Sequence, residues 1–395
     1  MRALRLLALV TLAALTGLTV PVPEVASQAT PAAPPGTTTN TTALLVSAIG
    51  DPLRVTGSDG LVHLEYDLVF TNVFTAPVTL TVIEVLTPDG RALQRLEGDA
   101  LEARTQPLFD RTPTDVVPES GALATMFDVI VPPDDIPERL THRITYDLAP
   151  DAPYATIIGS REIAGPELVV NPFVPVVVAP PLRGAGWANA NGCCDTSAHR
   201  SFRIAVDGSR LVSPETFAID WVRLEGNQLF AGDGTRNEDY FGFGAEIYAV
   251  ADGTVVFVRD GIAEETPNEP PTTLHQPIDY GGNEVVIEIA PGVFAFYAHM
   301  QPGSLRVRAG ETVTTGQVIG LLGDTGNSTA PHLHFELIDS PDTGLTATSL
   351  PFVIDEWTLA GTVSPESTAT DVQIVGTAEA QTKTLPLDQT VADFG

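Results

Sequence analysis

Residues 331–337 read PHLHFEL, in which His332 and His334 stand two positions apart in an apolar run. In a β-strand, side chains two positions apart point to the same face. The stretch therefore predicts a strand with an apolar side against a core and two titratable rings on the opposite side. Two such rings suit metal binding or proton transfer. The alternative is a pair of hydrogen-bonded histidines on a polar sheet face, because a short motif alone is weak.

The rest of the chain is also typical of β structure. Short runs rich in Val, Thr, Ile and Phe recur between turn residues, with 34 glycines and 33 prolines in 395 residues. Residues 61–70 alternate between polar and apolar, and residues 78–85 do so again after a proline. We therefore expect a mainly β fold, with an N-terminal immunoglobulin-like β-sandwich followed by a compact antiparallel β domain.

Changes in composition suggest where these parts begin and end. The predicted division is a signal peptide at 1–27, a linker at 28–40, the sandwich at 41–150, a connector at 151–186, the compact β domain at 187–345, and a C-terminal strand and tail at 346–395.

The N-terminus and the charge indicate a secreted protein. Arg2 and Arg5 precede an apolar run at 6–20, and small residues follow at 25–27, as in a secretory signal peptide. We expect an extracellular, periplasmic or cell-envelope protein with no stable membrane insertion after cleavage. The net charge of −30 repels phosphate backbones, so nucleic acid is excluded as a partner.

Cysteine contributes little to the expected stability. The two cysteines, Cys193 and Cys194, are adjacent. Their Cα atoms lie about 3.8 Å apart, closer than an ordinary disulfide prefers. The sequence predicts no disulfide framework, so apolar cores must hold the fold together.

Histidines concentrate in the predicted second domain, which contains five of the seven in the chain. Zinc binds His nitrogen and Asp oxygen, and a catalytic zinc takes three protein ligands and keeps one position for water. Clustered His and Asp without a thiol framework therefore suggest a metal site. One histidine of the 332/334 pair would bind the metal, and its neighbour would reach the reacting group.

Three stretches resemble the lysostaphin-type (LytM-like) zinc metallopeptidases. They are GQVIGLLGDTGNSTAPHLHFEL at 316–337, YAHM at 297–300 and GAEIYAVADGTV at 244–255, in the family's order and spacing. The resemblance covers residues 195–340 and is most specific at its C-terminal end. It implies a LytM-type β domain, one Zn2+ per chain, and hydrolysis of peptide cross-links in bacterial peptidoglycan.

The resemblance also implies roles for particular residues. His334 matches the zinc-ligating second histidine of the HxH motif. His332 matches the catalytic histidine, and His299 matches a second one that assists the water or the oxyanion. Asp220, in FAIDW, is similar to the family's ligand aspartate.

The first histidine ligand departs from the family's pattern. The usual spacing is His-x-x-x-Asp, but Thr216 stands four residues before Asp220. The nearest upstream histidine is His199, and a hairpin over 200–216 would be needed to bring it back to Asp220. Asp207 is the rival ligand, although it precedes a glycine in an apparent turn.

Two other functions are the alternatives to an enzyme. A catalytically silent relative could bind peptidoglycan or regulate a cell-wall hydrolase, and metal content would separate it from an enzyme. A lipoyl-type carrier domain would need a lysine at a hairpin tip. The one lysine, Lys383, lies outside this domain.

Overall fold

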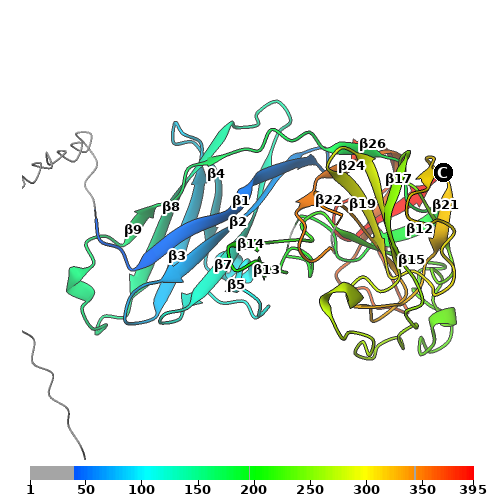
Figure 1. Cartoon of the computed structure of the whole chain (residues 1–395). Helices are drawn as coiled ribbons and strands as arrows, with labels where there is room; N and C mark the ends of the chain where they lie inside the picture. Colours follow the sequence, from blue (N-terminus) through cyan, green and yellow to red (C-terminus); the bar gives the residue numbers. More distant parts are fainter. Residues whose placement is uncertain (1–39, 195, 342–343) are drawn as a thin grey trace, which may run out of the picture. The chain divides into compact units, whose positions relative to one another are not determined.

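The computed structural model describes residues 40–194, 196–341 and 344–395. In these residues the chain is mostly β, and nearly all strand pairs are antiparallel, so the predicted mainly β fold is confirmed. Figure 1 shows the strands in two groups, an earlier one in blue to green and a later one in green to red. The predicted signal peptide and nearly all of the linker lie outside the described residues.

The first group is a sandwich of two antiparallel sheets that share one apolar core. One sheet has the order β1-β2-β7-β5, and the other has the order β10-β8-β3-β4, with β6 paired to β3 and β9 to β8. The immunoglobulin-like topology stays a prediction. The strands are β1 (Leu44–Thr56), β2 (Val62–Asn72), β3 (Val78–Leu86), β4 (Ala92–Glu97), β5 (Thr105–Pro107), β6 (Val116–Val117), β7 (Ala122–Val131), β8 (Arg139–Leu148), β9 (Glu162–Ala164) and β10 (Leu168–Val169); helix α1 (Asp99–Ala103) precedes β5.

Strand β2 is buried on both faces. Its even-numbered apolar residues, such as Leu64 and Phe70, join the sandwich core, as alternation predicts. Its odd-numbered polar residues His63, Glu65 and Asp67 are only 1–3% exposed, because the later part of the chain packs over them. The alternating sequence of β2 predicts a strand with one face in water, whereas in the structure both faces of β2 are buried.

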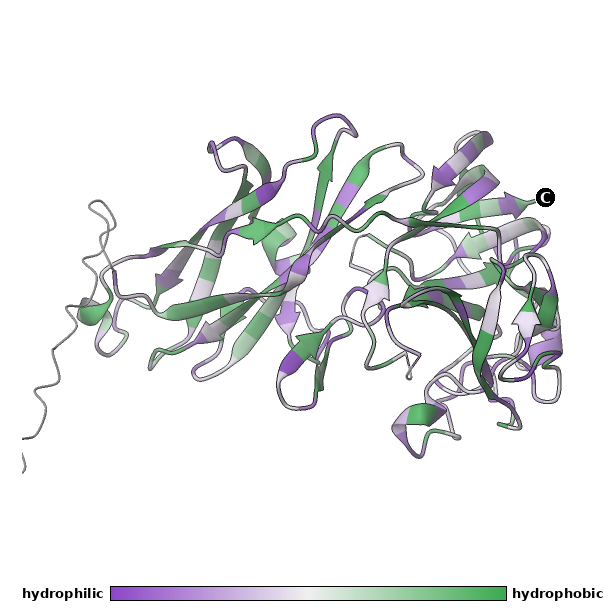
Figure 2. Ribbon diagram, turned by 45° about the horizontal axis from the view of Figure 1, so that its top comes forward, coloured by the Kyte–Doolittle hydropathy of each residue, from purple (hydrophilic) through white to green (hydrophobic). Residues whose placement is uncertain are grey.

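The second group is built on one large sheet with the order β11-β24-β27-β12-β15-β22-β19-β18-β17-β20. Strand β23 pairs with β22, and β25 and β26 pair with β24. Separate two-stranded ladders join β13 to β14 and β16 to β21. Figure 2 shows that these strands are largely hydrophobic, whereas the loops between them are mostly pale or hydrophilic.

The bounds of these elements are β11 (Val176–Val178), β12 (Gly184–Asn189), β13 (Ile204–Val206), β14 (Arg210–Val212), β15 (Ile219–Arg223), β16 (Glu246–Tyr248), β17 (Gly253–Arg259), β18 (Glu284–Ala290), β19 (Val293–Ala298), β20 (Thr312–Val313), β21 (Val318–Leu321), β22 (Leu333–Ile338), β23 (Ser349–Leu350), β24 (Phe352–Val363), β25 (Ile374–Val375), β26 (Glu379–Thr384) and β27 (Thr390–Phe394). Three short 3-10 helices are η1 (Ala155–Ile157), η2 (Asn237–Asp239) and η3 (Pro277–Asp279).

The connector and the tail of the predicted division both contain strands. Residues 151–186 supply β9 and β10 to the sandwich and β11 to the large sheet, where β11 runs parallel to β24. Residues 346–395 form β23 to β27, of which β27 pairs with β12 inside the large sheet. The domain boundaries themselves stay a prediction.

A buried ion network joins the sandwich to the loop that follows β12. Arg200 Nε donates to Glu65 Oε2 (2.6 Å) and Arg200 Nη2 to Asp67 Oδ1 (3.1 Å), while Arg203 Nε donates to Asp67 Oδ2 (2.8 Å). Burial raises the pKa of Asp67, but the two guanidinium groups outweigh it and hold the pKa below its ordinary value. Burial raises the pKa of Glu65 more than Arg200 lowers it. Asp67 is therefore the member whose charge balances the two arginines.

Backbone hydrogen bonds add a second join between the two groups of strands. Leu385 N donates to Thr56 O (2.8 Å), and Ser58 N donates to Leu385 O (2.9 Å). Both bonds lie at the end of β1, where it approaches β26 (Figure 1).

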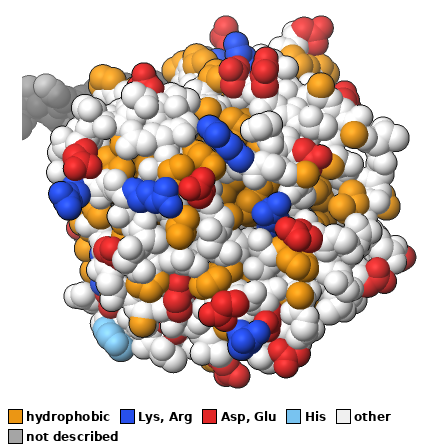
Figure 3. Space-filling view, turned by 90° about the vertical axis from the view of Figure 1, so that its right-hand side faces the viewer, with side chains coloured by type: hydrophobic (Ala, Val, Ile, Leu, Met, Phe, Trp, Pro, Cys, Tyr) orange, Lys and Arg blue, Asp and Glu red, His pale blue; other side chains and the backbone are white. Residues whose placement is uncertain are grey.

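The acidity of the chain is dispersed over the face drawn in Figure 3. Acidic side chains lie singly or in small groups there, with basic and apolar side chains between them. In the described part of the chain, no helix has the length and apolar character that a bilayer span requires.

Replacing Arg200 with Ala should destabilise the fold strongly. The change leaves Glu65 buried without its guanidinium partner and Asp67 with Arg203 alone. Removing one partner of a buried pair costs about 3–5 kcal/mol, and urea unfolding of the full chain would measure the loss.

Arg139→Ala is the matched control, because Arg139 pairs with Glu167 on the surface, where both side chains are 51% exposed. Such a pair contributes at most about 1 kcal/mol. Equal losses for the two variants would contradict a stabilising role for the buried network.

Candidate metal centre

Three neighbouring strands of the large sheet bring the central residues of the site together. Strand β22 lies between β15 and β19, and its His334 is directly opposite Asp220 on β15 and Ala298 on β19. His299 follows Ala298 immediately. Register therefore places the Asp220 carboxylate and the His334 imidazole side by side on one sheet face. His299 lies beyond the end of β19 with φ 62°, and its ring lies 5.8 Å from that of His334 between centroids.

His332 reaches the same point from just before β22. It forms a bridge with Gly323, and its Nε2 lies 3.3 Å from Asp220 Oδ1, while His334 Nδ1 lies 3.1 Å from the same oxygen. The predicted orientation of both rings toward one side is confirmed.

His199 arrives from the loop between β12 and β13. Strands β13 and β14 form the hairpin that the sequence predicted, turning at Asp207 and Gly208. The chain then returns through β15, and His199 Nε2 lies 3.2 Å from Asp220 Oδ2. Asp207 is exposed in the turn with φ 52° and does not line the site. Of the two rival residues, the structure brings Asp220 to the histidines.

The Asp220 carboxylate lies at a distance from two ring nitrogens that suits a shared metal ion. His199 Nε2 and His334 Nδ1 lie 3.2 and 3.1 Å from the Asp220 carboxylate. Ligand atoms in a tetrahedral zinc site, each about 2.1 Å from the ion, are about 3.4 Å apart. Two imidazole nitrogens and one carboxylate form the donor set of a catalytic Zn2+ site, so these residues fit a metal.

The remaining ring nitrogens show which tautomers are present. His199 Nδ1 contacts Ala218 O (3.3 Å), His299 Nδ1 contacts Thr325 O (2.7 Å), and His332 Nδ1 contacts Ala330 O (2.8 Å). A carbonyl only accepts hydrogen bonds, so each Nδ1 carries a proton. The Nε2 atoms of His199 and His332 face the Asp220 carboxylate. His334 is reversed, with Nε2 3.6 Å from Glu336 Oε1 and Nδ1 facing Asp220.

The electrostatics of the cluster follow from burial and from Asp220. Burial raises the pKa of Asp220, but His199 and His332 outweigh it and hold the pKa well below its ordinary value. For His334, burial lowers the pKa, yet the Asp220 carboxylate raises it well above the usual range. His299 differs, because burial and the charges of His332 and His334 lower its pKa well below the ordinary value. It is therefore the neutral imidazole of the group.

The five residues line a cavity of about 350 Å³. Its wall also contains residues that sequence reasoning missed. Asn191 donates from Nδ2 to Asp220 Oδ2 (2.8 Å), which orients the carboxylate. A second cavity of about 460 Å³ is lined by Arg200 and Thr216 among others, but no imidazole lines it.

Glu215 is the most notable of the missed residues. It is 3% exposed, and a carboxylate oxygen lies within 4.8 Å of the ring nitrogens of His199 and His334. It also hydrogen-bonds Tyr280, whose pKa is raised by burial and by this carboxylate. The available sequence signal was its place directly before Thr216, at the departure from the family's spacing.

A chain of polar contacts begins at the Nδ1 atom of His332. Ser328 Oγ lies 3.2 Å from His332 Nδ1 and 2.5 Å from Asp324 Oδ1, and Asp324 N donates to Glu264 Oε2 (2.6 Å). Burial raises the pKa of Asp324 and raises that of Glu264 to about 7.

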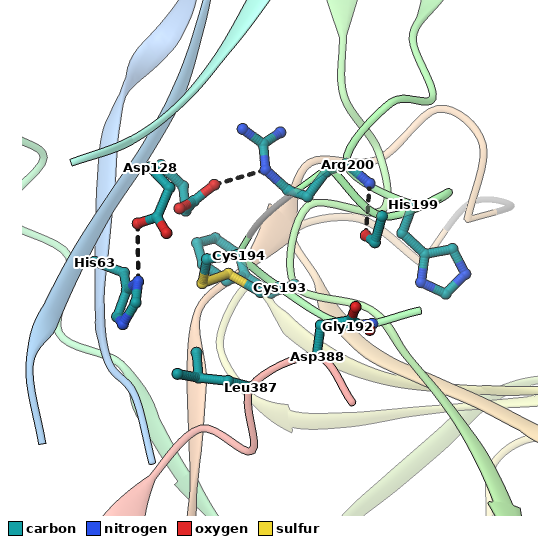
Figure 4. The surroundings of a disulfide bond; sticks show 12 residues. His63, Asp128, Gly192, Cys193, Cys194, His199, Arg200, Leu387 and Asp388 are labelled. Carbon is teal, nitrogen blue, oxygen red and sulfur yellow. Dashed lines mark hydrogen bonds and ion pairs between the residues drawn. A yellow bond between two sulfur atoms is a disulfide. The ribbon is translucent and has the colours of Figure 1, made fainter. Parts of the chain in front are cut away.

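The two cysteines lie close to the site but do not join it. Cys193 and Cys194 form a disulfide buried between the sandwich and the His199 loop (Figure 4). Cys194 lies in a group with His63 and Glu65. Its sulfur is engaged in the disulfide and is not a free thiolate.

Figure 4 also shows how the His199 loop is held. Arg200 reaches toward the sandwich carboxylates, while the adjacent His199 points the other way. Two consecutive residues of this segment therefore have different partners: His199 lies among the histidines of the candidate metal site, and Arg200 lies in the ion network.

The donor set and the cavity are compatible with a metal-dependent hydrolase. Residues 238–343 match the model of peptidase family M23, the LytM and lysostaphin family, so the chain contains an M23 peptidase domain. The match includes His299, His332 and His334. Asp220 and His199 precede it, so their assignment depends on the geometry above.

Named relatives match part of the chain. Peptidoglycan DD-endopeptidase ShyA of Vibrio cholerae is 39% identical over 92 residues, covering 23% of this chain and 19% of ShyA. Glycyl-glycine endopeptidase ALE-1 of Staphylococcus capitis is 40% identical over 75 residues, covering 18% of this chain and 20% of ALE-1. The chain thus spans about a fifth of the length of these relatives.

Among solved structures, a mutant of the catalytic domain of the prophage-encoded M23 protein EnpA from Enterococcus faecalis is 20% identical. The superposition covers 46% of this chain and 95% of that one, with a TM-score of 0.25.

The Glu264 carboxyl should make stability depend on pH. Its pKa is about 7 in the folded chain and about 4.5 when unfolded, so the folded state holds a proton that the unfolded state loses. The free energy of unfolding should therefore fall as the pH rises from about 4.5 to 7. Allowing for partial exposure, Glu264 accounts for about 2 kcal/mol of this fall.

Glu264→Gln should flatten that part of the profile, measured by urea unfolding at a series of pH values. Glu269→Gln, an exposed change in the same loop, should leave it as in the wild type. A Glu264→Gln profile as steep as that of the wild type would contradict the assignment.

Proposed function

We propose that the protein is a secreted zinc metalloendopeptidase that hydrolyses peptide cross-links of bacterial peptidoglycan. The observation that carries the proposal is the meeting of His199 Nε2, His334 Nδ1 and the Asp220 carboxylate within 3.1–3.2 Å, at the wall of a cavity. The peptidoglycan substrate is suggested by the names of the relatives, and secretion by the signal-peptide pattern at 1–27.

His199, Asp220 and His334 would hold the metal ion. When bound, Zn2+ supplies Lewis acidity that polarises a carbonyl and makes a water molecule more acidic. Asn191 keeps the Asp220 carboxylate in place, and Glu336 faces the ring nitrogen of His334 that points away from the cluster. These contacts hold the donors in position before any substrate arrives.

His332 and His299 would act on the attacking water molecule and its proton. Each has its Nδ1–H hydrogen-bonded to a backbone carbonyl, so Nε2 is the ring nitrogen that would exchange a proton with water. We assign His332 as the group that takes a proton from the attacking water and passes it to the leaving amine. His299, kept neutral by burial and by its two neighbours, would accept a hydrogen bond from that water and orient it.

The catalytically silent alternative is not favoured by these residues. A silent relative would lack ligands or proton-transfer groups, whereas all five side chains meet at one cavity here. The unusual position of the first histidine is compensated by the hairpin that returns the chain.

The first test separates metal binding from catalysis within the histidine pair. The wild type should contain one zinc per chain and cleave purified peptidoglycan. His334→Ala should lose both metal and activity, because it removes a donor. His332→Ala should keep the metal and lose activity. Elemental analysis and a peptidoglycan-release assay measure the two properties, and equal metal loss in both variants would reverse the assignment.

The second test concerns the first ligand. His199→Ala should weaken zinc binding by about two orders of magnitude or more, because it removes one of three donors. Asp207→Ala is the matched control, since Asp207 sits in the turn of the same hairpin and should keep the wild-type affinity. Competition with a chromogenic chelator gives both affinities. Zinc loss in Asp207→Ala with none in Asp220→Ala would overturn the ligand set.

A further inference from the structure

The sandwich contributes one residue to the wall of the catalytic cavity. Residues 108–115 connect β5 to β6, and Arg111, near the tip of this loop, lines the same cavity as the five site residues. It is the only Lys or Arg among the residues that line it.

Contacts hold the loop next to the site. Gln106 Nε2 donates to Ser201 O (2.8 Å), two residues after His199. The ring of Phe109 meets Phe202 edge-on at 6.1 Å between centroids, and Phe202 stacks on Tyr280 at 6.0 Å. At the far end of the loop, Thr114 N donates to Thr105 O (2.9 Å). The tip therefore rests on the segment that presents the first metal ligand.

The guanidinium of Arg111 is free to bind a ligand. Four other arginines of the sandwich form ion pairs with nearby carboxylates: Arg91, Arg95, Arg139 and Arg143. No ion pair joins Arg111 to any carboxylate in residues 40–194, 196–341 and 344–395, and its side chain is exposed. The guanidinium of Arg111 is therefore available to bind an anionic ligand.

The acidic surroundings of the cavity explain what a positive guanidinium would contribute there. The chain has a net charge of −30, and the cavity wall also contains the carboxylates of Glu215 and Asp220. An anionic peptide would be repelled here unless a positive group met it. A guanidinium binds a carboxylate with two parallel hydrogen bonds, which fixes position as well as charge.

We propose that Arg111 binds a carboxylate of the substrate peptide and so selects anionic peptides for the catalytic cavity. This inference deepens the proposed function and rests on it. The carboxylate is either the C-terminus of the peptide or an acidic group within it, and both have the same chemistry. The sandwich is thereby part of the substrate site, and Arg111 determines specificity without taking part in proton transfer.

The test uses disaccharide-free stem-peptide dimers in three forms. One has all carboxylates free, a second has only the C-terminal carboxylates amidated, and a third has every carboxylate amidated. The wild type should have a KM about tenfold lower for the free acid than for the full amide. The second form identifies which carboxylate is bound.

Arg111→Ala should raise KM for the free acid about tenfold, change kcat little, and leave the full amide unaffected. Arg111→Lys should recover part of the loss, because charge remains but the paired hydrogen bonds do not. Arg308→Ala is the control, since Arg308 is exposed and lines no described cavity wall. It should behave as the wild type.

Equilibrium binding separates this inference from the proposed function. Full-length His332→Ala, which should not turn the dimers over, would be titrated with the acid and amide forms, with and without Arg111→Ala. A preference for the acid that disappears with Arg111 supports the inference even if the wild type cleaves nothing. Cleavage of acid and amide with equal KM, unchanged in Arg111→Ala, would overturn the inference and leave the peptidase assignment standing.

Discussion

The site depends on a buried ion network between β2 of the sandwich and the loop after β12. Asp67 accepts from both Arg200 and Arg203, and Glu65 accepts from Arg200. Because all four side chains are at most 2% exposed, none can leave the network without burying an unpaired charge. The network thus fixes the backbone of a segment with no regular secondary structure of its own, and that segment carries His199.

The proposed metal ligands are therefore positioned in two ways, by strand pairing and by buried ion pairs. Asp220 and His334 lie on paired strands, so backbone hydrogen bonds set their separation. His199 comes from a loop, and its position is set by ion pairs to another part of the chain. His199 can reach the cluster although it does not stand four residues before Asp220. The additional residues between the two form the hairpin of β13 and β14, which returns the chain to the site.

The sandwich is consequently more than an appended module. It buries the polar face of β2 against the later part of the chain, and its 108–115 loop reaches the cavity with Arg111. Residues on the sandwich thus bear on the position of His199 and on the charge at the cavity wall. The sandwich and the large sheet both contribute to the surroundings of the site.

The sequence by itself determined the mainly β fold, the shared face of His332 and His334, and the candidate set of His199, Asp220, His299, His332 and His334. The β fold and the shared face follow from the two-residue period of strands and from local turns, which neighbouring residues encode. The candidate set follows from the resemblance of the motifs to those of the LytM-like metallopeptidases. Only the tertiary structure decided that Asp220 rather than Asp207 meets the histidines, that Glu65 and Asp67 are buried, and that Glu215 and Arg111 line the cavity. These depend on packing between segments more than a hundred residues apart in several cases, such as Asp67 with Arg200. Local periodicity gives the direction in which a side chain points, but not the segment that will cover it.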